Sequence, residues 1–153
     1  MLHEHGQMRS AEKYQRIFDR SVTNDVSMSM RFDTMPGLSV SVDQVAYHPE
    51  ITAPPDRPHP FVYHLSIHNQ SEETVTIFGR KWIVTDEGGE TLVVEGDGVV
   101  GQFPRLEPGA TFSYNSYHVI RDASTATGTF FGQTEGGHPV YVRIPEFKMA
   151  LPE

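Results

Sequence analysis

The glycine-rich segment at residues 96–101 constrains the fold more than any other part of the chain. It reads Gly-Asp-Gly-Val-Val-Gly, which has the glycine spacing of a dinucleotide-binding loop. In a nucleotide-binding fold the third glycine opens a helix, and the N-terminal amides of that helix hold the phosphates. Pro104 and the pair Pro108-Gly109 follow closely and would end such a helix. The segment therefore predicts a tight connection between β-strands.

Composition narrows the class of protein further. The chain has 153 residues, enough for one domain, and its 13 glycines and 11 prolines suit a β-protein with many turns. It has no cysteine, which excludes disulfides, thiolate metal sites and a cysteine nucleophile. A net charge of −8 disfavours nucleic acid and anionic membranes as partners. With no apolar run of membrane-spanning length and no secretory pattern at the start, we expect a cytoplasmic protein.

Residues 1–36 differ from the rest of the chain and are interpreted as an N-terminal extension. Residues 10–20 could form a short helix with Ser10 as its N-cap. Tyr14, Ile17 and Phe18 would share one face of that helix. This face could cover a sheet edge in the same chain or in a second copy, so a homodimer is one hypothesis.

From residue 37 to 153 the pattern changes to alternation with period two, which is typical of half-buried strands. Gly79 predicts a bulge within one of these strands, and the proline-rich residues 49–60 predict a loop. We expect seven strands, over residues 38–42, 61–68, 74–85, 91–94, 112–116, 127–133 and 140–144. Short strands at this spacing indicate an all-β, immunoglobulin-like sandwich.

Four segments, in this order and spacing, carry a family likeness. They are Arg80–Asp86, Gly96–Gly101, Leu106–Ser116 and Ile144–Phe147. Together they resemble the ApaG family over roughly residues 38–151. The chain departs from the family pattern around residues 117–126, where a glycine usually follows the position of Ser116 and a proline-containing turn follows.

The resemblance implies a fibronectin type III-like sandwich of about seven strands. Bacterial members of the family are linked genetically to cobalt tolerance and magnesium efflux and have no established catalytic activity. Similar domains in eukaryotes occur in an F-box protein and in a DNA-polymerase-interacting protein, where they look like protein-binding modules. The resemblance thus favours a protein–protein interaction module linked to Co²⁺/Mg²⁺ homeostasis, with an unidentified protein partner.

The glycine connection allows a second interpretation, in which the chain is a small-anion or metal-responsive binding protein that uses residues 96–101. Successive amides at Gly96, Gly98 and Gly101, helped by Arg105, could hold phosphate or pyrophosphate without a helix. The main interpretation is that these glycines supply positive φ angles in a β connection. Asp122 lies at roughly the spacing of a ribose-binding acid, but no βαβ unit surrounds it.

The central strand supplies the candidate core. Trp82 and Val84 should point inward together, with Asp86 emerging at one end of the strand and Arg80 lying near the bend at Gly79. The functional alternative is that Arg80 lines a surface groove.

Eight histidines prompt a search for metal ligands. His64 and His68 have the spacing of a helical zinc pair, but on a strand four residues span about 13 Å, which is too far for one ion. We expect them to form a row on one sheet face. His3 with the terminal amine could bind Cu(II) or Ni(II) in a square-planar site. His59, His118 and His138 share no ligand spacing, so no metal site and no cofactor are predicted.

Catalysis has no local support in the sequence. There is no Gly-x-Ser-x-Gly elbow, and the adjacent acids Glu72-Glu73 and Asp86-Glu87 lie in turn-like segments. We therefore expect a non-enzymatic binding domain. Its candidate contact regions are the loop 49–60, the glycine connection 96–104 and a loop at 117–127.

Overall fold

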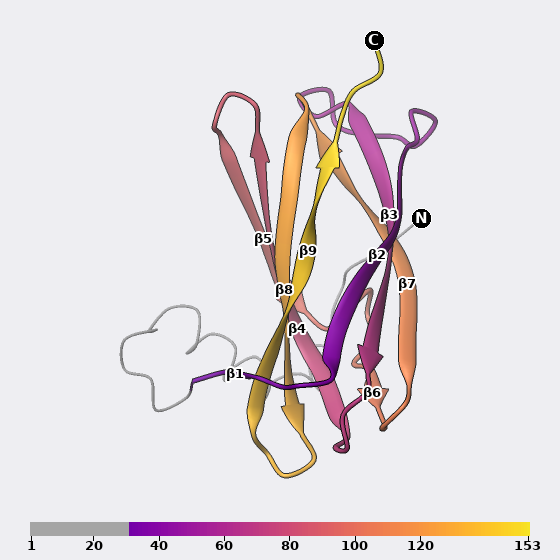
Figure 1. Ribbon diagram of the computed structural model, residues 1–153. Coiled ribbons are helices and arrows are strands. Elements are labelled where there is room, and N and C mark those ends of the chain that lie inside the picture. Colours follow the sequence, from indigo (N-terminus) through magenta and orange to yellow (C-terminus); the bar gives the residue numbers. More distant parts are fainter. Residues whose placement is uncertain (1–30) are drawn as a thin grey trace.

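The computed structural model describes residues 31–153, and this part of the chain is a two-layer β-sandwich (Figure 1). Within it no helix forms, so no helix could span a membrane. Seven strands have seven or more residues, as expected from the sequence, and two have only two residues. The strands are β1 (Asp33–Thr34), β2 (Leu38–Tyr47), β3 (His59–Asn69), β4 (Val75–Asp86), β5 (Thr91–Asp97), β6 (Arg105–Leu106), β7 (Thr111–Ile120), β8 (Ser124–Thr134) and β9 (Pro139–Met149).

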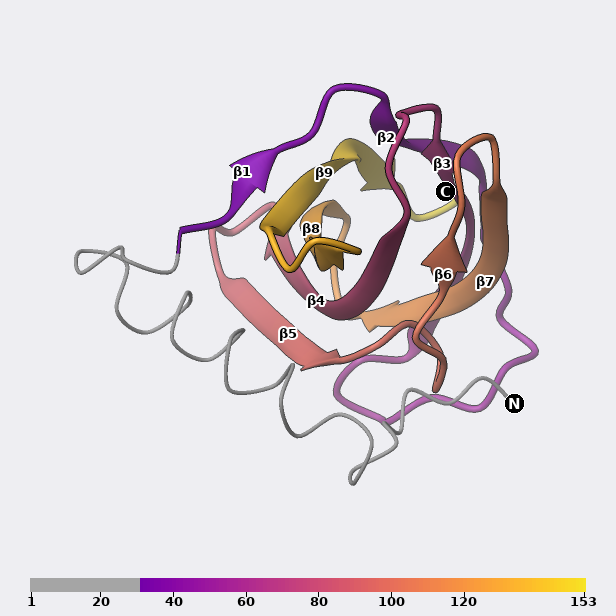
Figure 2. The ribbon, with the colours of Figure 1, turned by 90° about the horizontal axis from the view of Figure 1, so that it is seen from below.

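The two sheets have different sizes. The larger has the order β1-β9-β8-β4-β5, with β6 also paired to β4, and the smaller has the order β2-β3-β7. Every long pairing is antiparallel, whereas β1 runs parallel to β9. Consecutive strands are thus joined partly within a sheet and partly across the sandwich, which is how both layers come to share one core (Figure 2).

The core between the sheets comes from alternate residues of facing strands. On β3, Tyr63, Leu65 and Ile67 are fully buried, and on β4 Trp82 has no exposed surface while Val84 keeps 6%. The inward orientation expected for Trp82 and Val84 is therefore confirmed. Because side chains alternate between faces along a strand, the residues between these positions face outward.

A bulge in β4 brings a second, smaller apolar cluster to the outer face of the larger sheet. The register of β4 against β8 shifts between Ile77 and Gly79, which agrees with the bulge expected near Gly79. Phe78 at the bulge packs with Phe131 and with Phe32, whose ring centre lies 5.0 Å from that of Phe131.

The sandwich begins before residue 37, the boundary suggested by the change of pattern. Phe32 packs on the larger sheet, and Asp33 and Thr34 pair with Val140 and Tyr141 of β9. Two paired residues are too few to give a period-two signal, so the pattern could not reveal them. The proposed helix at residues 10–20 and its apolar stripe lie outside the described residues.

The connections sort to the two ends of the sandwich. One end carries the loop between β2 and β3, the hairpin between β4 and β5, and the turn between β7 and β8. The glycine connection between β5 and β6 is not at that end, because Gly79 pairs with Asp97 and Ile77 bonds to Pro104. The prediction of a loop at residues 117–127 is wrong. Only residues 121–123 lie outside strands there, since β7 extends to Ile120 and β8 starts at Ser124.

Candidate functional site

Within residues 31–153, the sandwich is closed on one flank and open on the other. On the closed flank β2 lies against β9. On the open flank the outer strand of the larger sheet, β5, and the outer strand of the smaller sheet, β7, border a groove of about 330 Å³. Residues of β4, β5 and β7 line this groove together with Arg57 from the loop between β2 and β3. We call it the β5–β7 groove.

The floor of the β5–β7 groove contains a pair of nitrogen-bearing rings. Trp82 of β4 and His118 of β7 meet edge to face, with ring centres 4.6 Å apart. Tyr63 packs 4.8 Å from His118, and Phe147 covers both rings from β9. The aromatic packing holds the two rings in fixed positions.

His118 is kept neutral by this environment. It is only 9% exposed, and burial lowers the pKa of its imidazole from 6.5 to about 3. The physical cause is the loss of hydration of the charged form in an apolar layer. At neutral pH the ring therefore carries one N–H donor and one acceptor nitrogen.

Two polar atoms in the floor have no hydrogen-bond partner among residues 31–153. They are Nε1 of Trp82 and Nε2 of His118. A buried donor or acceptor left unpaired costs roughly 1–3 kcal/mol, so such atoms in a protein call for an explanation. Both nitrogens are covered by surrounding protein atoms, so their unpaired state is a cost carried by the folded sandwich beneath the groove.

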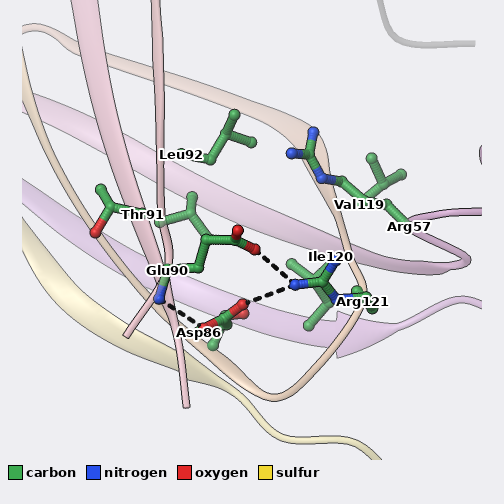
Figure 3. Close-up of a pocket in the computed structure, with 10 residues that line it drawn as sticks. Arg57, Asp86, Glu90, Thr91, Leu92, Val119, Ile120 and Arg121 are labelled. Atoms are coloured by element: carbon green, nitrogen blue, oxygen red, sulfur yellow. Dashed lines mark hydrogen bonds and ion pairs between the residues drawn. The ribbon is translucent and has the colours of Figure 1, made fainter. Parts of the chain in front are cut away.

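A second pocket of about 270 Å³ continues the groove toward the end of the sandwich that carries the β4–β5 hairpin (Figure 3). Arg121 lies between Asp86 and Glu90 there, with its Nη2 3.4 Å and 2.6 Å from their carboxylate oxygens. The Arg121 guanidinium also contacts Asp122. Its charge is therefore balanced within the chain.

Arg57 differs from Arg121. It is half-buried, lines both pockets, and has no carboxylate partner within the described part of the chain. Figure 3 shows its side chain extending from the β2–β3 loop over the pocket. Arg57 can therefore offer a charged donor pair to an incoming anionic group.

The glycine connection has a hairpin geometry. The amides and carbonyls of Val99 and Gln102 bond to each other at 2.8 and 3.0 Å, and the two residues between them, Val100 and Gly101, have φ of 42° and 80°. This is the pattern of a two-residue type I′ turn. Gly98 also has positive φ, 63°, so the main interpretation of these glycines fits the backbone.

The amides of this connection are partly used within the chain. The Gly98 N–H donates to the carbonyl of Phe78 at 2.7 Å, and the Val99 N–H donates to Gln102. Arg105 lies on β6 and pairs with Glu107 and Glu135. An anion at this connection would therefore have to compete with existing hydrogen bonds and ion pairs.

Arg80, rather than Arg105, is the cation next to the glycine connection. Its Nη1 donates to the carbonyls of Asp97 and Gly98, at 2.8 and 3.2 Å. A Cβ on Gly96 would lie 2.6 Å from Nη2 of Arg80. Arg80 is 3% exposed, so it supports the backbone from inside and the alternative that it lines a surface groove is wrong.

His64 and His68 of β3 lie on the outer face of the smaller sheet, as expected. His68 lies 2.9 Å from the hydroxyl of Ser41, and Ser41 donates to Asp43. The hydroxyls of Ser66 and Ser41 lower the pKa of Asp43 by bonding to its charged form. Because Ser41 gives its proton to Asp43, the order differs from a catalytic triad, in which the histidine lies between the serine and the acid.

The other sequence candidates do not converge. His59 bonds to Tyr47, His138 pairs with Asp33, and Asp122 pairs with Arg121. No group of three or more histidines and acids able to hold a metal ion occurs among residues 31–153. His3 lies outside that range.

Sequence reasoning missed the functional candidates in the groove. His118 continues the alternation of Phe112, Tyr114 and Ser116, so extending that strand by two residues would have placed its ring inside the sandwich. Arg57 gave no signal, because its position over the groove depends on the path of an irregular loop.

Comparison with known proteins defines the class. A family model described as the ApaG domain matches residues 49–134. The chain is 36% identical over 116 residues to Protein ApaG of Ralstonia nicotianae, covering 75% of this chain and 93% of that protein. It is 37% identical over 108 residues to Protein ApaG of Rhodopseudomonas palustris, with coverages of 70% and 83%.

A solved structure gives the same result. The ApaA protein of Bordetella pertussis superposes with a TM-score of 0.69 at 36% identity, covering 80% of this chain and 98% of that one. Fold and comparisons thus define an all-β sandwich domain of one known type. The chain belongs to the ApaG family.

Proposed function

We propose that this ApaG-family chain is a non-enzymatic domain that binds another protein, and that the β5–β7 groove receives an extended segment of that partner. One observation carries the proposal: the outer strands of the two sheets, β5 and β7, border the same cavity. Among residues 31–153, β5 bonds only to β4 and β7 only to β3, so within this part of the chain each has an unpaired backbone edge. An extended segment can add to such an edge as a further strand and place alternate side chains in a neighbouring pocket.

The charge at the groove supports a partner segment with acidic residues. The chain as a whole carries a net charge of −8, yet Arg57 lies over the groove without a carboxylate partner in the described region. An acidic side chain of the partner would pair with Arg57, and bidentate pairing would fix its position along the groove.

A peptide selection with two matched variants tests the proposal. Random decapeptides are selected against the full chain and then assayed on Leu92→Arg and Val93→Arg. Leu92 lines the groove, whereas Val93 is the next residue on the same strand and is 49% exposed on the opposite face. We expect selected peptides to shift the amide signals of β5 and β7 and to lose at least tenfold in affinity on Leu92→Arg alone.

The alternatives predict other results. Peptides that bind both variants equally would place recognition elsewhere and contradict the proposal. Sedimentation measures self-association. If the chain self-associates and Leu92→Arg abolishes this, the groove binds a second copy of the chain instead of another protein. The anion-binding alternative predicts a saturable shift of the Gly96–Gly101 amides by pyrophosphate, and it has less support because of the hydrogen bonds already made there.

The cellular side of the proposal comes from the family resemblance. We propose that a cytoplasmic partner links this domain to Co²⁺/Mg²⁺ homeostasis, and that the sandwich follows the fibronectin type III arrangement. A strain lacking the gene, complemented with either variant, would test the link. Cobalt tolerance restored by Val93→Arg but not by Leu92→Arg is the expected result. If both variants restored cobalt tolerance equally, the groove would have no part in Co²⁺/Mg²⁺ homeostasis.

A further inference from the structure

The hydrogen bonds between β4 and β5 divide the residues of β5 into two alternating sets. At one end of the pair the Asp86 N–H donates to the Glu90 carbonyl at 2.9 Å, and at the other end the Gly98 N–H donates to the Phe78 carbonyl at 2.7 Å. The register between these two bonds has no shift. Because hydrogen-bonded and non-hydrogen-bonded positions alternate in an antiparallel pair, the backbone groups of the even-numbered residues of β5 face β4.

The odd-numbered residues of β5 consequently have their backbone N–H and C=O groups on the open flank. Within the strand they include Thr91, Val93 and Glu95, which are all exposed. In residues 31–153 no strand other than β4 pairs with β5. An added strand can therefore form hydrogen bonds with β5 at every second residue, over a length of about 13 Å.

β5 lacks the features that commonly protect an edge strand from further pairing. From Thr91 to Gly96 it has no proline, no lysine and no bulge. Its one charged residue in this range, Glu95, has a carboxylate oxygen 3.7 Å from Nζ of Lys81. β2, in contrast, contains a register shift near its middle. Proteins usually interrupt or charge an edge that must stay unpaired, so the regular edge of β5 indicates a strand that receives another one.

The side chains of β5 favour an apolar run in the added strand. Leu92 and Val94 line the β5–β7 groove and pack partly on the core, whereas Val93 lies on the opposite face of the strand. Val93 is 49% exposed and is the one exposed large apolar side chain of the described region. Residues directly opposite each other on paired strands contact, so three consecutive apolar residues of a partner would cover Leu92, Val93 and Val94.

The charges near the two ends of β5 favour one position for an acidic residue of the partner. Arg57 lines a pocket together with Thr91, and the two acids of the β4–β5 hairpin at this end are already paired with Arg121. The other end of β5 carries Glu95 and Asp97. A partner carboxylate at the Thr91 end can therefore pair with Arg57, whereas at the other end it would approach like charges.

We infer that β5 is the strand that receives the partner, through the backbone groups of Thr91, Val93 and Glu95. The partner segment carries three consecutive apolar residues opposite residues 92–94, with an acidic residue beside them at the Thr91 end. The inference rests on the proposed function, because it specifies which edge of the β5–β7 groove bonds to the partner and which sequence that edge selects.

Amide exchange with a defined peptide tests the inference. The probe is acetyl-Lys-Asp-Val-Ile-Val-Thr-Lys-amide, and its control, acetyl-Lys-Asp-Ser-Asn-Ser-Thr-Lys-amide, lacks the apolar run. In the free ¹⁵N-labelled full chain we expect fast exchange at Thr91, Val93 and Glu95 and slow exchange at Leu92 and Val94. The saturating probe should slow exchange of the first three amides at least tenfold, because they become hydrogen-bonded, and the control should not.

A proline substitution tests the same backbone contact by affinity. Val93→Pro removes an N–H that faces away from β4, a position at which an edge strand tolerates proline. Val93→Ile keeps the N–H and an apolar side chain, so it is the matched control. We expect Val93→Pro to weaken binding of the probe about tenfold through the lost hydrogen bond and Val93→Ile to leave it nearly unchanged. The thermal midpoint shows whether Val93→Pro is folded, and if it is not, exchange in the unaltered chain decides.

Slow exchange at Thr91, Val93 and Glu95 in the free chain would overturn the inference. Protection that disappears on dilution would mean that a second copy pairs with β5, and protection that persists would mean that another part of the same chain does.

Three results with the probe would also overturn it. They are affinity no higher than that of the control peptide, binding that leaves the three amides unprotected, and full affinity in a folded Val93→Pro. If the selected decapeptides still lost affinity on Leu92→Arg in these cases, the proposed function would stand and the inference about β5 alone would be rejected.

Discussion

Val100 shows how a single residue can conflict with the turn that contains it. It is the only residue other than glycine with positive φ in residues 31–153, and its branched Cβ makes that conformation unfavourable. Asparagine accepts this conformation and is preferred in type I′ turns. Val100→Asn should therefore raise the free energy of unfolding by about 1 kcal/mol, less any loss of the partial packing of Val100 on the core.

Urea denaturation of the two proteins measures this difference. Val93→Asn, an exposed change on the regular strand β5, is the control and should give no increase. Equal stability of Val100→Asn and the unaltered protein would show that the turn carries no strain.

His118 links the stability of the protein to pH. Its pKa is about 3 in the folded chain and near 6.5 when unfolded, so between these values the unfolded chain binds one more proton. The contribution of His118 to the free energy of unfolding is therefore fully present above pH 6.5. On acidification toward pH 3, this contribution falls by about 1.4 kcal/mol per pH unit.

Urea denaturation between pH 4.5 and 7.5 measures that slope. In His118→Phe the slope should lose this contribution, whereas His64→Gln, a change on the outer face of β3, should keep it. Parallel pH profiles for His118→Phe and the unaltered protein would contradict the assignment.

At the level of strands, Asn69 connects three elements at the end of β3. Its side-chain amide donates to the carbonyls of Glu73 and Leu106, each at 2.8 Å, and its oxygen accepts from the backbone and hydroxyl of Ser71. The residue is completely buried, so removing the side chain leaves carbonyls without donors. Asn69→Ala should lower the free energy of unfolding by about 3 kcal/mol.

Chemical denaturation gives this loss, and amide exchange locates it. Exchange should accelerate first in β6 and in the turn between β3 and β4. Ser71→Ala, which removes one partner at a more exposed position, should cost less than half as much. An Asn69→Ala protein of unchanged stability would mean that this network adds nothing net.

Sequence patterns revealed the strands well because alternation survives wherever one face is buried. Phe61 to His68 is a clear example, with every second residue in the core. The same signal stopped too early on β7, because Ser116, Tyr117 and His118 place polar and aromatic residues on both faces of the strand. The two-residue strands β1 and β6 are too short to show any period.

The candidate site was less visible from the sequence, since it is assembled from residues far apart in the chain. Trp82 was recognised as a core residue, but its neighbour His118 comes from the other sheet and Arg57 from a loop. Only the pairing of strands into two layers brings them together. The family, in contrast, could be identified from four local motifs, because each of them is contiguous.

At the scale of the whole molecule, the segment before β2 secures the outer face of the larger sheet. The Phe32 ring lies 6.1 Å from Phe78 and 5.0 Å from Phe131, while β1 next to it pairs with β9. Phe32→Ala should therefore lower the free energy of unfolding by about 2 kcal/mol through lost aromatic contact.

The thermal midpoint provides the measurement. Val93→Ala, an exposed apolar residue on the other outer strand, is the control and should have a much smaller effect. A thermal midpoint unaffected by Phe32→Ala would mean that the segment contributes no stability to the sandwich.

The distribution of strand edges has a consequence for assembly. On the flank where β2 lies against β9, β2 is interrupted by a register shift at Asp43, and β1 pairs with β9 at Val140 and Tyr141. Among residues 31–153, a further strand therefore finds no long uninterrupted ladder on this flank. In the described part of the chain, the continuous strand edges, those of β5 and β7, lie on a single flank. Growth of the sheet from molecule to molecule would need two such flanks, so copies that met edge to edge would stop at a closed pair and could not elongate into a fibre.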